Sequence, residues 1–200
     1  GRAVPLAGLV NAVLRGRLRD GADPRPGDDV HRFGLPGWMA ARIRVDWPDE
    51  ADEVLAAGNR PPSTWLRANR RRTDPAELAG RLHADGIESI FDPAFPDALR
   101  LAHPVAIGDL PGLAAGELSV QDAGAQAAAD LLDLADGQRV LDACAAPGGK
   151  AAHILERAEV DLTAVELDPA RASRIDESLR RLGLEADVVT GDAGQPEDWW

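Results

Sequence analysis

Strands that alternate with longer helices constrain the fold of residues 120–200 more than any other feature of this sequence. The expected elements are, in chain order, a helix at 122–134, a strand at 139–143, a helix that ends near Arg157, a strand at 161–166, a helix at 169–182 and a strand at 186–190. Strands separated by such helices are typical of a parallel, doubly wound sheet. That sheet binds its ligand at the carboxyl ends of its strands. We therefore expect a binding site at that edge.

The first of these strands runs into a glycine-rich turn, Val140-Leu-Asp-Ala-Cys-Ala-Ala-Pro-Gly-Gly-Lys150. Glycines allow the backbone to approach a ligand closely, and the N–H groups of the following helix are free to bind it. The alternative is a turn that uses glycine for its geometry alone. Two nucleotide-binding motifs are excluded by spacing. The dinucleotide fingerprint is absent, and a P-loop needs glycine where Cys144 stands and Ser or Thr where Ala151 stands.

Acidic residues follow the second and third strands. Glu166 ends the second strand about 20 positions after the turn, where a carboxylate can accept hydrogen bonds from both hydroxyls of a ribose. Asp192 follows the third strand and could accept from an adenine amino group. A solvated loop acid is the alternative for each. Taken together, the three strand ends predict one nucleotide-like ligand.

The first 119 residues show a different pattern of expected helices and strands from the rest. A helix with an apolar stripe is expected at 4–19, then an irregular connection at 21–37 and helices at 38–45 and 49–57. We interpret residues 1–57 as the end of an all-helical domain. A Gly/Pro linker at 58–62 then leads to a strand at 64–69, a helix at 74–85, and extended pieces at 87–91 and 99–106. Residues 58–119 are therefore predicted to form a small α/β module, and 120–200 a separate domain.

Charge is distributed unevenly along the chain, whose formal net charge is −12. Residues 1–120 carry 15 arginines against 17 acids, and residues 121–200 carry 7 basic residues against 17 acids. The first part is thus nearly neutral, so it is the better candidate for RNA binding. Its best patch is a stretch without acids, made up of Arg60, Trp65, Arg67, Arg70, Arg71 and Arg72. Guanidinium groups can contact phosphates while an indole stacks on a base. Solvated arginines around a core tryptophan are the alternative.

Composition limits the other classes of function. The only cysteine, Cys144, cannot form an internal disulfide or a multi-cysteine zinc site. No apolar run approaches the roughly 20 residues needed to span a bilayer, and the segment after Gly1 lacks the pattern of a signal peptide. We expect a cytoplasmic protein without a membrane or metal role, whose first residue is cut or internal. The sequence does not indicate an oligomeric state.

A resemblance to a known family covers essentially the whole chain. The segment from Leu141 to Lys150 resembles the first motif of the RsmB (Sun or Fmu) family of ribosomal RNA 5-methylcytosine methyltransferases. Residues 11–15 resemble the last helix of that family's NusB-like domain, residues 60–69 the entry to its pre-methyltransferase module, and residues 120–126 the lead-in to its cofactor domain. The resemblance implies three parts: a NusB-like remnant, an α/β module, and the first half of a Rossmann-like methyltransferase sheet.

The resemblance also implies a cofactor, S-adenosylmethionine, and a partner, small-subunit (16S) ribosomal RNA. Residues in the glycine-rich turn would wrap the methionine and ribose parts of the cofactor, namely Cys144, Ala145, Ala146, Pro147, Gly148, Gly149 and Lys150. Glu166 would hold the ribose, Asp192 would sit near the adenine, and Asp142 would help to orient the amino group. Members of the family often have Asp where Glu166 stands.

The expected reaction is methyl transfer to C5 of cytosine, which reacts only after a cysteine thiolate has added to C6. The family's two catalytic cysteines lie downstream of the third strand, so the resemblance places them beyond Trp200, and Cys144 is not expected to be the nucleophile. We therefore expect the chain alone to be inactive. Two alternatives stay open: a noncatalytic RNA-binding or assembly protein with a vestigial cofactor turn, and a nucleotide-binding domain that does not bind RNA.

Overall fold

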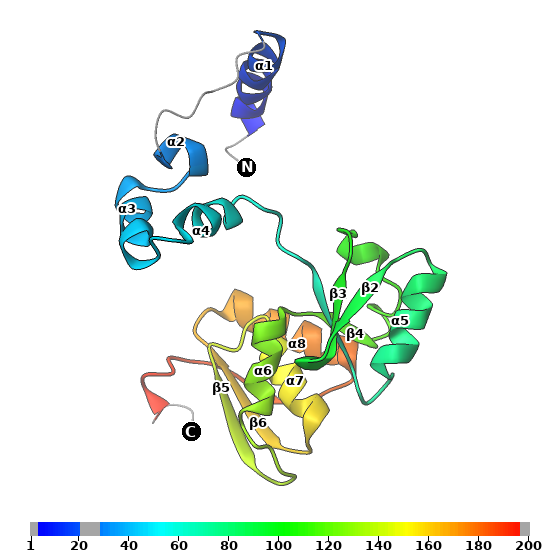
Figure 1. The fold of residues 1–200 in the computed structure, drawn as a ribbon. Helices are drawn as coiled ribbons and strands as arrows, with labels where there is room; N and C mark the ends of the chain where they lie inside the picture. Colours follow the sequence, from blue (N-terminus) through cyan, green and yellow to red (C-terminus); the bar gives the residue numbers. More distant parts are fainter. Residues whose placement is uncertain (1–3, 21–28, 197–200) are drawn as a thin grey trace. The chain divides into compact units, whose positions relative to one another are not determined.

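The computed structural model describes residues 4–20 and 29–196, and the chain divides into two compact units, 1–61 and 62–200. The described part of the first unit is helical, with α1 (Val4–Asp20), α2 (Asp29–Phe33), α3 (Gly37–Asp46) and α4 (Ala51–Ala57) (Figure 1). Its core is formed by Phe33, Ala40 and Leu55. Helix α2 lies within the connection that was predicted to be irregular at 21–37, and residues 21–28 of that connection lie outside the described residues. Five residues are too few to show a helical period.

The apolar stripe predicted on the first helix is exposed in the structure. Its members are between 53% and 83% exposed, namely Leu6, Leu9, Val10, Val13, Leu14 and Leu18. The helix therefore forms with the expected face, and no described residue covers that face.

The second unit begins with an antiparallel sheet of four strands in the order β2-β3-β1-β4. The strands are β1 (Trp65–Ala68), β2 (Ser89–Asp92), β3 (Phe95–Leu101) and β4 (Leu118–Val120). Helix α5 (Pro75–Ala84) packs on this sheet, and the carboxylate of Asp74 caps it by accepting from the N–H of Ala76 at 2.8 Å. A short 3₁₀ turn, η1 (Ile107–Asp109), precedes β4. One core cluster, which includes Leu66, Leu82 and Leu99, joins the sheet to α5.

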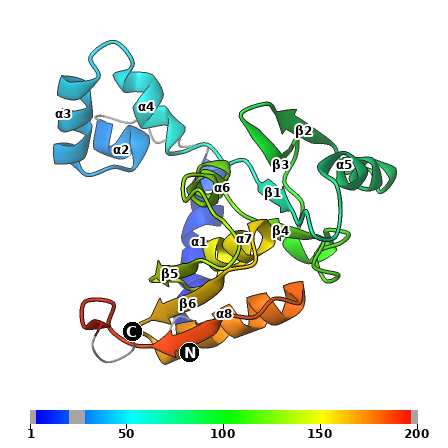
Figure 2. The same ribbon diagram turned by 90° about the horizontal axis from the view of Figure 1, so that it is seen from below.

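A parallel sheet of three strands in the order β5-β6-β7 follows, as the sequence predicted (Figure 2). Its elements are α6 (Ala123–Asp130), β5 (Arg139–Ala143), α7 (Gly149–Arg157), β6 (Asp161–Glu166), α8 (Pro169–Leu182) and β7 (Asp187–Thr190). Helices α7 and α8 contact each other and both pack against β6. Helix α8 begins at the N-cap Asp168 and ends at Gly183, which has a φ of 71°. The local signals read from the sequence account for the bounds of α8, whereas α6 ends at Asp130 and not at the expected residue 134.

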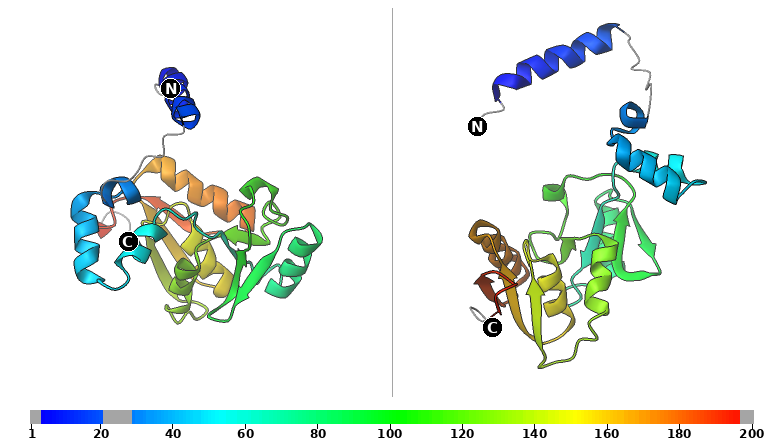
Figure 3. Two further views of the ribbon diagram at one scale, coloured as in Figure 1. Left: turned by 45° about the horizontal axis from the view of Figure 1, so that its top comes forward. Right: turned by 90° about the vertical axis from the view of Figure 1, so that its left-hand side faces the viewer.

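Helix α6 lies between the two sheets (Figure 3, right). It packs against β1 and β3 of the antiparallel sheet on one side and against α7 on the other. Side chains that leave β1 on the face opposite its core therefore point toward α6 and α7. Within residues 4–20 and 29–196, no helix is long and apolar enough to cross a membrane, and no cluster of three His, Cys, Asp or Glu side chains could hold a metal ion.

Candidate functional site

The glycine turn, residues 144–150, joins β5 to α7 at the carboxyl edge of the parallel sheet. Cys144 adopts a φ of 63° and Gly148 a φ of 97°, so two of the turn's residues have positive φ. The N–H of Ala145 donates to the carbonyl of Val165 at 3.0 Å, and the N–H of Gly148 donates to the carbonyl of Ala145 at 2.7 Å. The first bond holds the turn against the neighbouring strand β6, and the second closes the turn on itself.

Helix α8 supports the glycine turn from the side. The hydroxyl of Ser178 donates to the carbonyl of Pro147 at 2.7 Å. A Cβ atom at Gly148 would lie only 3.3 Å from the Cα of Ile175 on the same helix. Gly148 is also the N-cap of α7 and provides no side-chain acceptor. The N–H groups of Gly149 and Lys150 therefore receive no capping side chain from Gly148 and are available to a ligand, whereas the N–H of Ala151 donates to Asp142.

A pocket of about 200 Å³ lies at the glycine turn. It is lined by Val120, Gln121, Ala125, Asp142, Cys144, Ala145, Ala146, Pro147, Gly149 and Lys150. The lining thus comes from the end of β4, helix α6 and the β5–α7 connection. Six of the seven turn residues singled out from the sequence line it, and Gly148 does not.

Asp142 presents an unsatisfied acceptor in this pocket. Its Oδ2 atom is buried and has no hydrogen-bond partner among the described residues. Burial raises the pKa of this carboxyl, while the charge of Lys150 and a backbone hydrogen bond from Ala151 oppose the rise. A bound donor would satisfy Oδ2 and favour the charged form.

Glu166 presents a second unsatisfied acceptor at the same edge. Its side chain is 3% exposed, and its Oε1 atom accepts from the N–H of Asp168 at 3.3 Å and pairs with Arg171 at 3.2 Å. Its Oε2 atom is buried and has no partner among the described residues. A buried carboxylate oxygen without a donor is uncommon, because leaving it unpaired costs about 1–3 kcal/mol. Glu166 is thus arranged to receive a donor from a ligand.

Asp192 lies on the strand end next to Glu166. The N–H of Gly191 donates to the carbonyl of Glu166 at 3.1 Å, which brings the end of β7 beside the end of β6. The carboxylate of Asp192 accepts from the N–H of Gly194 at 2.8 Å and from the side chain of Gln195 at 3.3 Å. The three strand ends singled out from the sequence therefore share one edge of the sheet, although Glu166 and Asp192 do not line the pocket at the turn.

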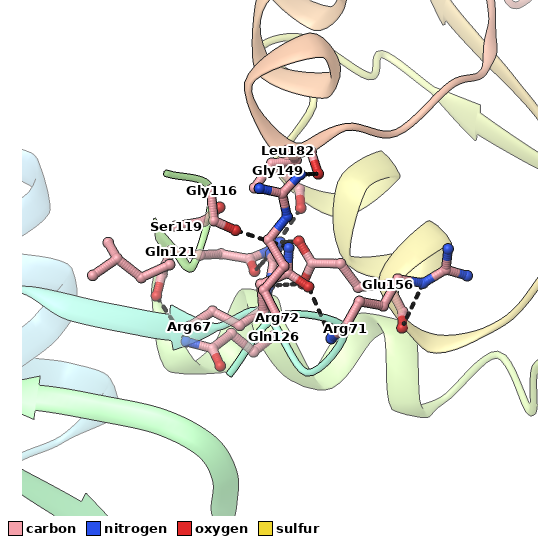
Figure 4. A network of polar contacts seen from close by, with 12 residues as sticks. Arg67, Arg71, Arg72, Gly116, Ser119, Gln121, Gln126, Gly149, Glu156 and Leu182 are labelled. Atoms are coloured by element: carbon pink, nitrogen blue, oxygen red, sulfur yellow. Dashed lines mark hydrogen bonds and ion pairs between the residues drawn. The ribbon is translucent and has the colours of Figure 1, made fainter. Parts of the chain in front are cut away.

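The arginine stretch predicted to bind RNA is arranged differently from that expectation. Arg67 is fully buried, and its guanidinium forms two bonds with the carboxylate of Glu156 on α7, of 3.0 and 2.8 Å (Figure 4). The prediction that Arg67 contacts RNA is therefore wrong. A charge on the inner face of a central strand is paired with an opposite charge on the helix that packs there, and it cannot reach a phosphate.

The next three arginines are exposed at the surface but already have partners. Arg70 pairs with Asp74 and Asp97 at 2.7 and 3.0 Å. Arg71 pairs with Glu159 at 2.7 Å. Arg72 donates to two main-chain carbonyls: that of Ala115, shortly before β4, at 2.5 Å and that of Leu182, at the end of α8, at 2.7 Å. Arg71 and Arg72 thus connect the β1 region to the parallel-sheet part of the unit.

The remaining predicted RNA contacts lie at β1 and before it. Arg60 is exposed. Trp65 is half-buried, with its ring edge-on to Phe95 at 6.2 Å between centroids. Their contact with RNA stays a prediction.

Glu156 and Gln121 were missed by the sequence reasoning. Glu156 lies 89 positions from Arg67, and the side-chain oxygen of Gln121 accepts a short hydrogen bond from the same guanidinium. Burial raises the pKa of Glu156, and its hydrogen bond and charge contact with Arg67 oppose that rise. The only local signal was the presence of ionisable residues among the buried residues of α7.

His153 is a second buried ionisable group on α7. Its ring is 3% exposed, and neither ring nitrogen has a hydrogen-bond partner among the described residues. Burial lowers its pKa to about 3, and the nearby charges of Arg67 and Arg157 act in the same direction. The ring is therefore neutral at ordinary pH.

Comparison with known proteins gives consistent matches in both sequence and structure. A family model for the ferredoxin-like domain of RsmF/B-like methyltransferases matches residues 35–108, and a model for 16S rRNA methyltransferase RsmB/F matches residues 129–200. Ribosomal RNA small subunit methyltransferase B of Yersinia enterocolitica is 44% identical over 197 residues, which are 97% of this chain and 46% of that protein. The protein of the same name from Xanthomonas campestris is 44% identical over 97% of this chain and 44% of its own length.

The chain thus spans less than half the length of these curated relatives. Among solved structures, a methyltransferase homolog protein from Pyrococcus horikoshii matches with a TM-score of 0.76 and 24% identity, over 88% of this chain and 59% of that one. At that identity the likeness concerns the fold alone.

Proposed function

This chain belongs to the RsmB/F family of 16S ribosomal RNA methyltransferases, and from that membership we propose that it carries the cofactor half of an enzyme that methylates C5 of a cytosine in small-subunit ribosomal RNA. The proposed methyl donor is S-adenosylmethionine. The groups described above fit that cofactor, because they combine a glycine turn, the first two N–H groups of α7 and two unsatisfied carboxylate oxygens at one sheet edge.

The observation that carries the proposal is the unpartnered Oε2 atom of Glu166. A ribose presents two neighbouring hydroxyl donors, and a carboxylate at the end of the second strand is placed to accept from them. Asp142 would accept from the cofactor's amino group in the same way. The turn residues 144–150 would surround its methionine and ribose parts, and Asp192 would lie near the adenine.

S-adenosylmethionine would supply an electrophilic methyl group. The residues of this chain would bind and orient the cofactor and exclude water from one side of it. Cytosine C5 is a poor nucleophile until a thiolate adds to C6. We do not propose Cys144 as that thiolate, because it belongs to the glycine turn and lines the cofactor pocket.

Ribosomal RNA is the proposed substrate, and Arg60 and Trp65 are its proposed contacts in this chain. Arg70, Arg71 and Arg72 could contribute only by exchanging a protein partner for a phosphate, so we assign them a secondary role. A positively charged surface without competing acids would have been the stronger site.

The cofactor half is tested by titrating this chain with S-adenosylmethionine in a calorimeter. The reaction is tested by incubating the longer enzyme proposed to contain this chain with cofactor labelled in its methyl group and with small-subunit ribosomal RNA, and then digesting the RNA to nucleosides. Label in 5-methylcytidine, together with a bisulfite-resistant cytosine in the RNA, is the expected result. Label in another nucleoside would refute the proposed position. Binding of RNA without any binding of cofactor would instead support a noncatalytic RNA-binding protein.

A further inference from the structure

Arg67 touches the glycine turn as well as Glu156. Its Nη1 atom donates to the carbonyl of Gly149 at 3.0 Å and also to the side-chain oxygen of Gln121 (Figure 4). One guanidinium from the antiparallel sheet thus binds three acceptors at once, on α7, at the end of β4 and in the glycine turn. Its rigid planar fork fixes all three relative to one another.

The contact with Gly149 bears on the pocket through the peptide plane. The carbonyl of Gly149 and the N–H of Lys150 belong to the same planar peptide unit and point in opposite directions. That N–H is one of the first in α7 and has no partner within the helix. Gly149 and Lys150 both line the pocket, so a donor that holds this carbonyl also holds the peptide unit that carries the N–H.

Gln121 extends the same support to the other wall of the pocket. The side-chain amide of Gln121 donates to the main-chain carbonyl of Ala125 at 3.4 Å. The main-chain carbonyl of Gln121 accepts from the side-chain amide of Gln126 at 3.0 Å. Gln121, Ala125 and Gly149 all line the pocket. The walls contributed by β4, α6 and the glycine turn are therefore connected through Arg67.

The charge of Arg67 is neutralised by Glu156, which is 6% exposed and pairs with it through both carboxylate oxygens. The main effect of the guanidinium on the pocket is therefore to hold Gln121 and Gly149 in place, and not to supply a positive charge. We propose that Arg67 is a positioning residue through which the antiparallel sheet sets the shape of the cofactor turn. This inference rests on the proposed function for its ligand, and on the described contacts for its geometry.

The test compares two double variants with the unaltered chain. Arg67→Met with Glu156→Met removes the donor to Gly149 without leaving a buried charge unpaired, and such replacements often preserve stability. Arg71→Met with Glu159→Met is the matched control, because it removes an ion pair between the same two parts of the unit without touching Gly149. Two quantities are measured under conditions where circular dichroism shows every variant folded: amide hydrogen exchange at residues 149–152 in the ligand-free chain, and the dissociation constant of S-adenosylmethionine.

We expect the Arg67 variant to exchange those amides faster and to bind the cofactor about tenfold more weakly, a change equivalent to about 1.4 kcal/mol. The control should change neither quantity. Exchange and affinity unchanged in the Arg67 variant would overturn the proposal.

Two other outcomes, no cofactor binding by the unaltered chain and a double variant that does not fold, can be distinguished from failure of the proposal. If the unaltered chain does not bind S-adenosylmethionine, the proposed function fails, and the exchange measurement alone decides the role of Arg67. If the double variant does not fold, Arg67→Lys replaces it. A single ammonium keeps the charge beside Glu156 but cannot also span to Gly149, so faster exchange at 149–152 supports the proposal and unchanged exchange overturns it.

Discussion

Replacing Glu166 by glutamine should weaken cofactor binding without weakening the fold. The variant keeps the volume of the side chain and one acceptor oxygen but loses the negative charge. A hydrogen bond to a charged group contributes about 1.5–3 kcal/mol, which corresponds to roughly a 10- to 150-fold change in affinity. Because Oε1 is already engaged with Asp168 and Arg171, only Oε2 is free for the ribose. The expected loss is therefore toward the lower end, about tenfold.

The ligand-free chain should respond in the other direction. Its Oε2 atom is buried without a donor, so an uncharged amide at Glu166 removes a desolvated charge. We expect an unfolding midpoint in urea that is equal to or above that of the unaltered chain. Opposite signs in affinity and stability would distinguish a ligand-binding group from a structural one.

Isothermal titration calorimetry with S-adenosylmethionine measures the first quantity, and urea denaturation measures the second. Glu177→Gln, an exposed carboxylate on α8, is the control and should alter neither. Glu166→Ala should reduce affinity at least as much as the glutamine variant. Unchanged affinity in both Glu166 variants would remove this residue from the site and with it the main support for the cofactor.

Three further predictions concern the glycine turn and α7. Gly148→Ala should lower the free energy of unfolding by about 1–2 kcal/mol in urea denaturation, because it places a Cβ at a φ of 97° and 3.3 Å from the Cα of Ile175; an unchanged midpoint would contradict the described turn. The pKa of His153 is about 3 in the folded chain against an ordinary 6.5, so the unfolded chain takes up this proton first and stability is lost as pH falls from 6.5 toward 3. His153→Leu should remove about 2 kcal/mol of the stability difference between pH 7 and pH 5, measured by urea denaturation at both values, and an equal pH dependence in the two proteins would argue against this assignment. Cys144→Ala should bind S-adenosylmethionine as tightly as the unaltered chain in calorimetry, whereas a large loss would give the thiol a role that we do not propose.

The parallel-sheet part of the fold could be predicted because its signals are local. Strands β5 and β6 and helix α8 have the bounds expected from the sequence. The strands are marked by apolar runs, and the helix by an N-cap aspartate and a terminal glycine. Short elements gave weaker signals. Strand β4 has three residues and was not predicted, and β3 begins at Phe95 instead of Leu99. The division into three domains and the NusB-like character of the first stay predictions.

The candidate site was predictable only in part, for a related reason. The glycine turn, Glu166 and Asp192 follow consecutive strands, so chain order alone indicated that they share an edge. The role of Arg67 depends on Glu156, 89 residues later, and on how α6 packs against both β1 and α7. A run of arginines without acids inside it favoured RNA binding. The acids that pair with these arginines are Asp74, just beyond the run, and Asp97, Glu156 and Glu159 on other elements.

The paired charges of Arg67 and Glu156 also determine where this protein can be cut. A piece that began at residue 121 would retain the glycine turn, Glu166 and Asp192, yet its Glu156 would lose both guanidinium bonds, and Gly149 would lose its donor. A piece that ended at residue 120 would carry Arg67 with no carboxylate to receive it. The smallest segment suitable for crystallising the cofactor turn in its native shape therefore has to start ahead of Trp65, even though no residue of the antiparallel sheet before Val120 lines the pocket.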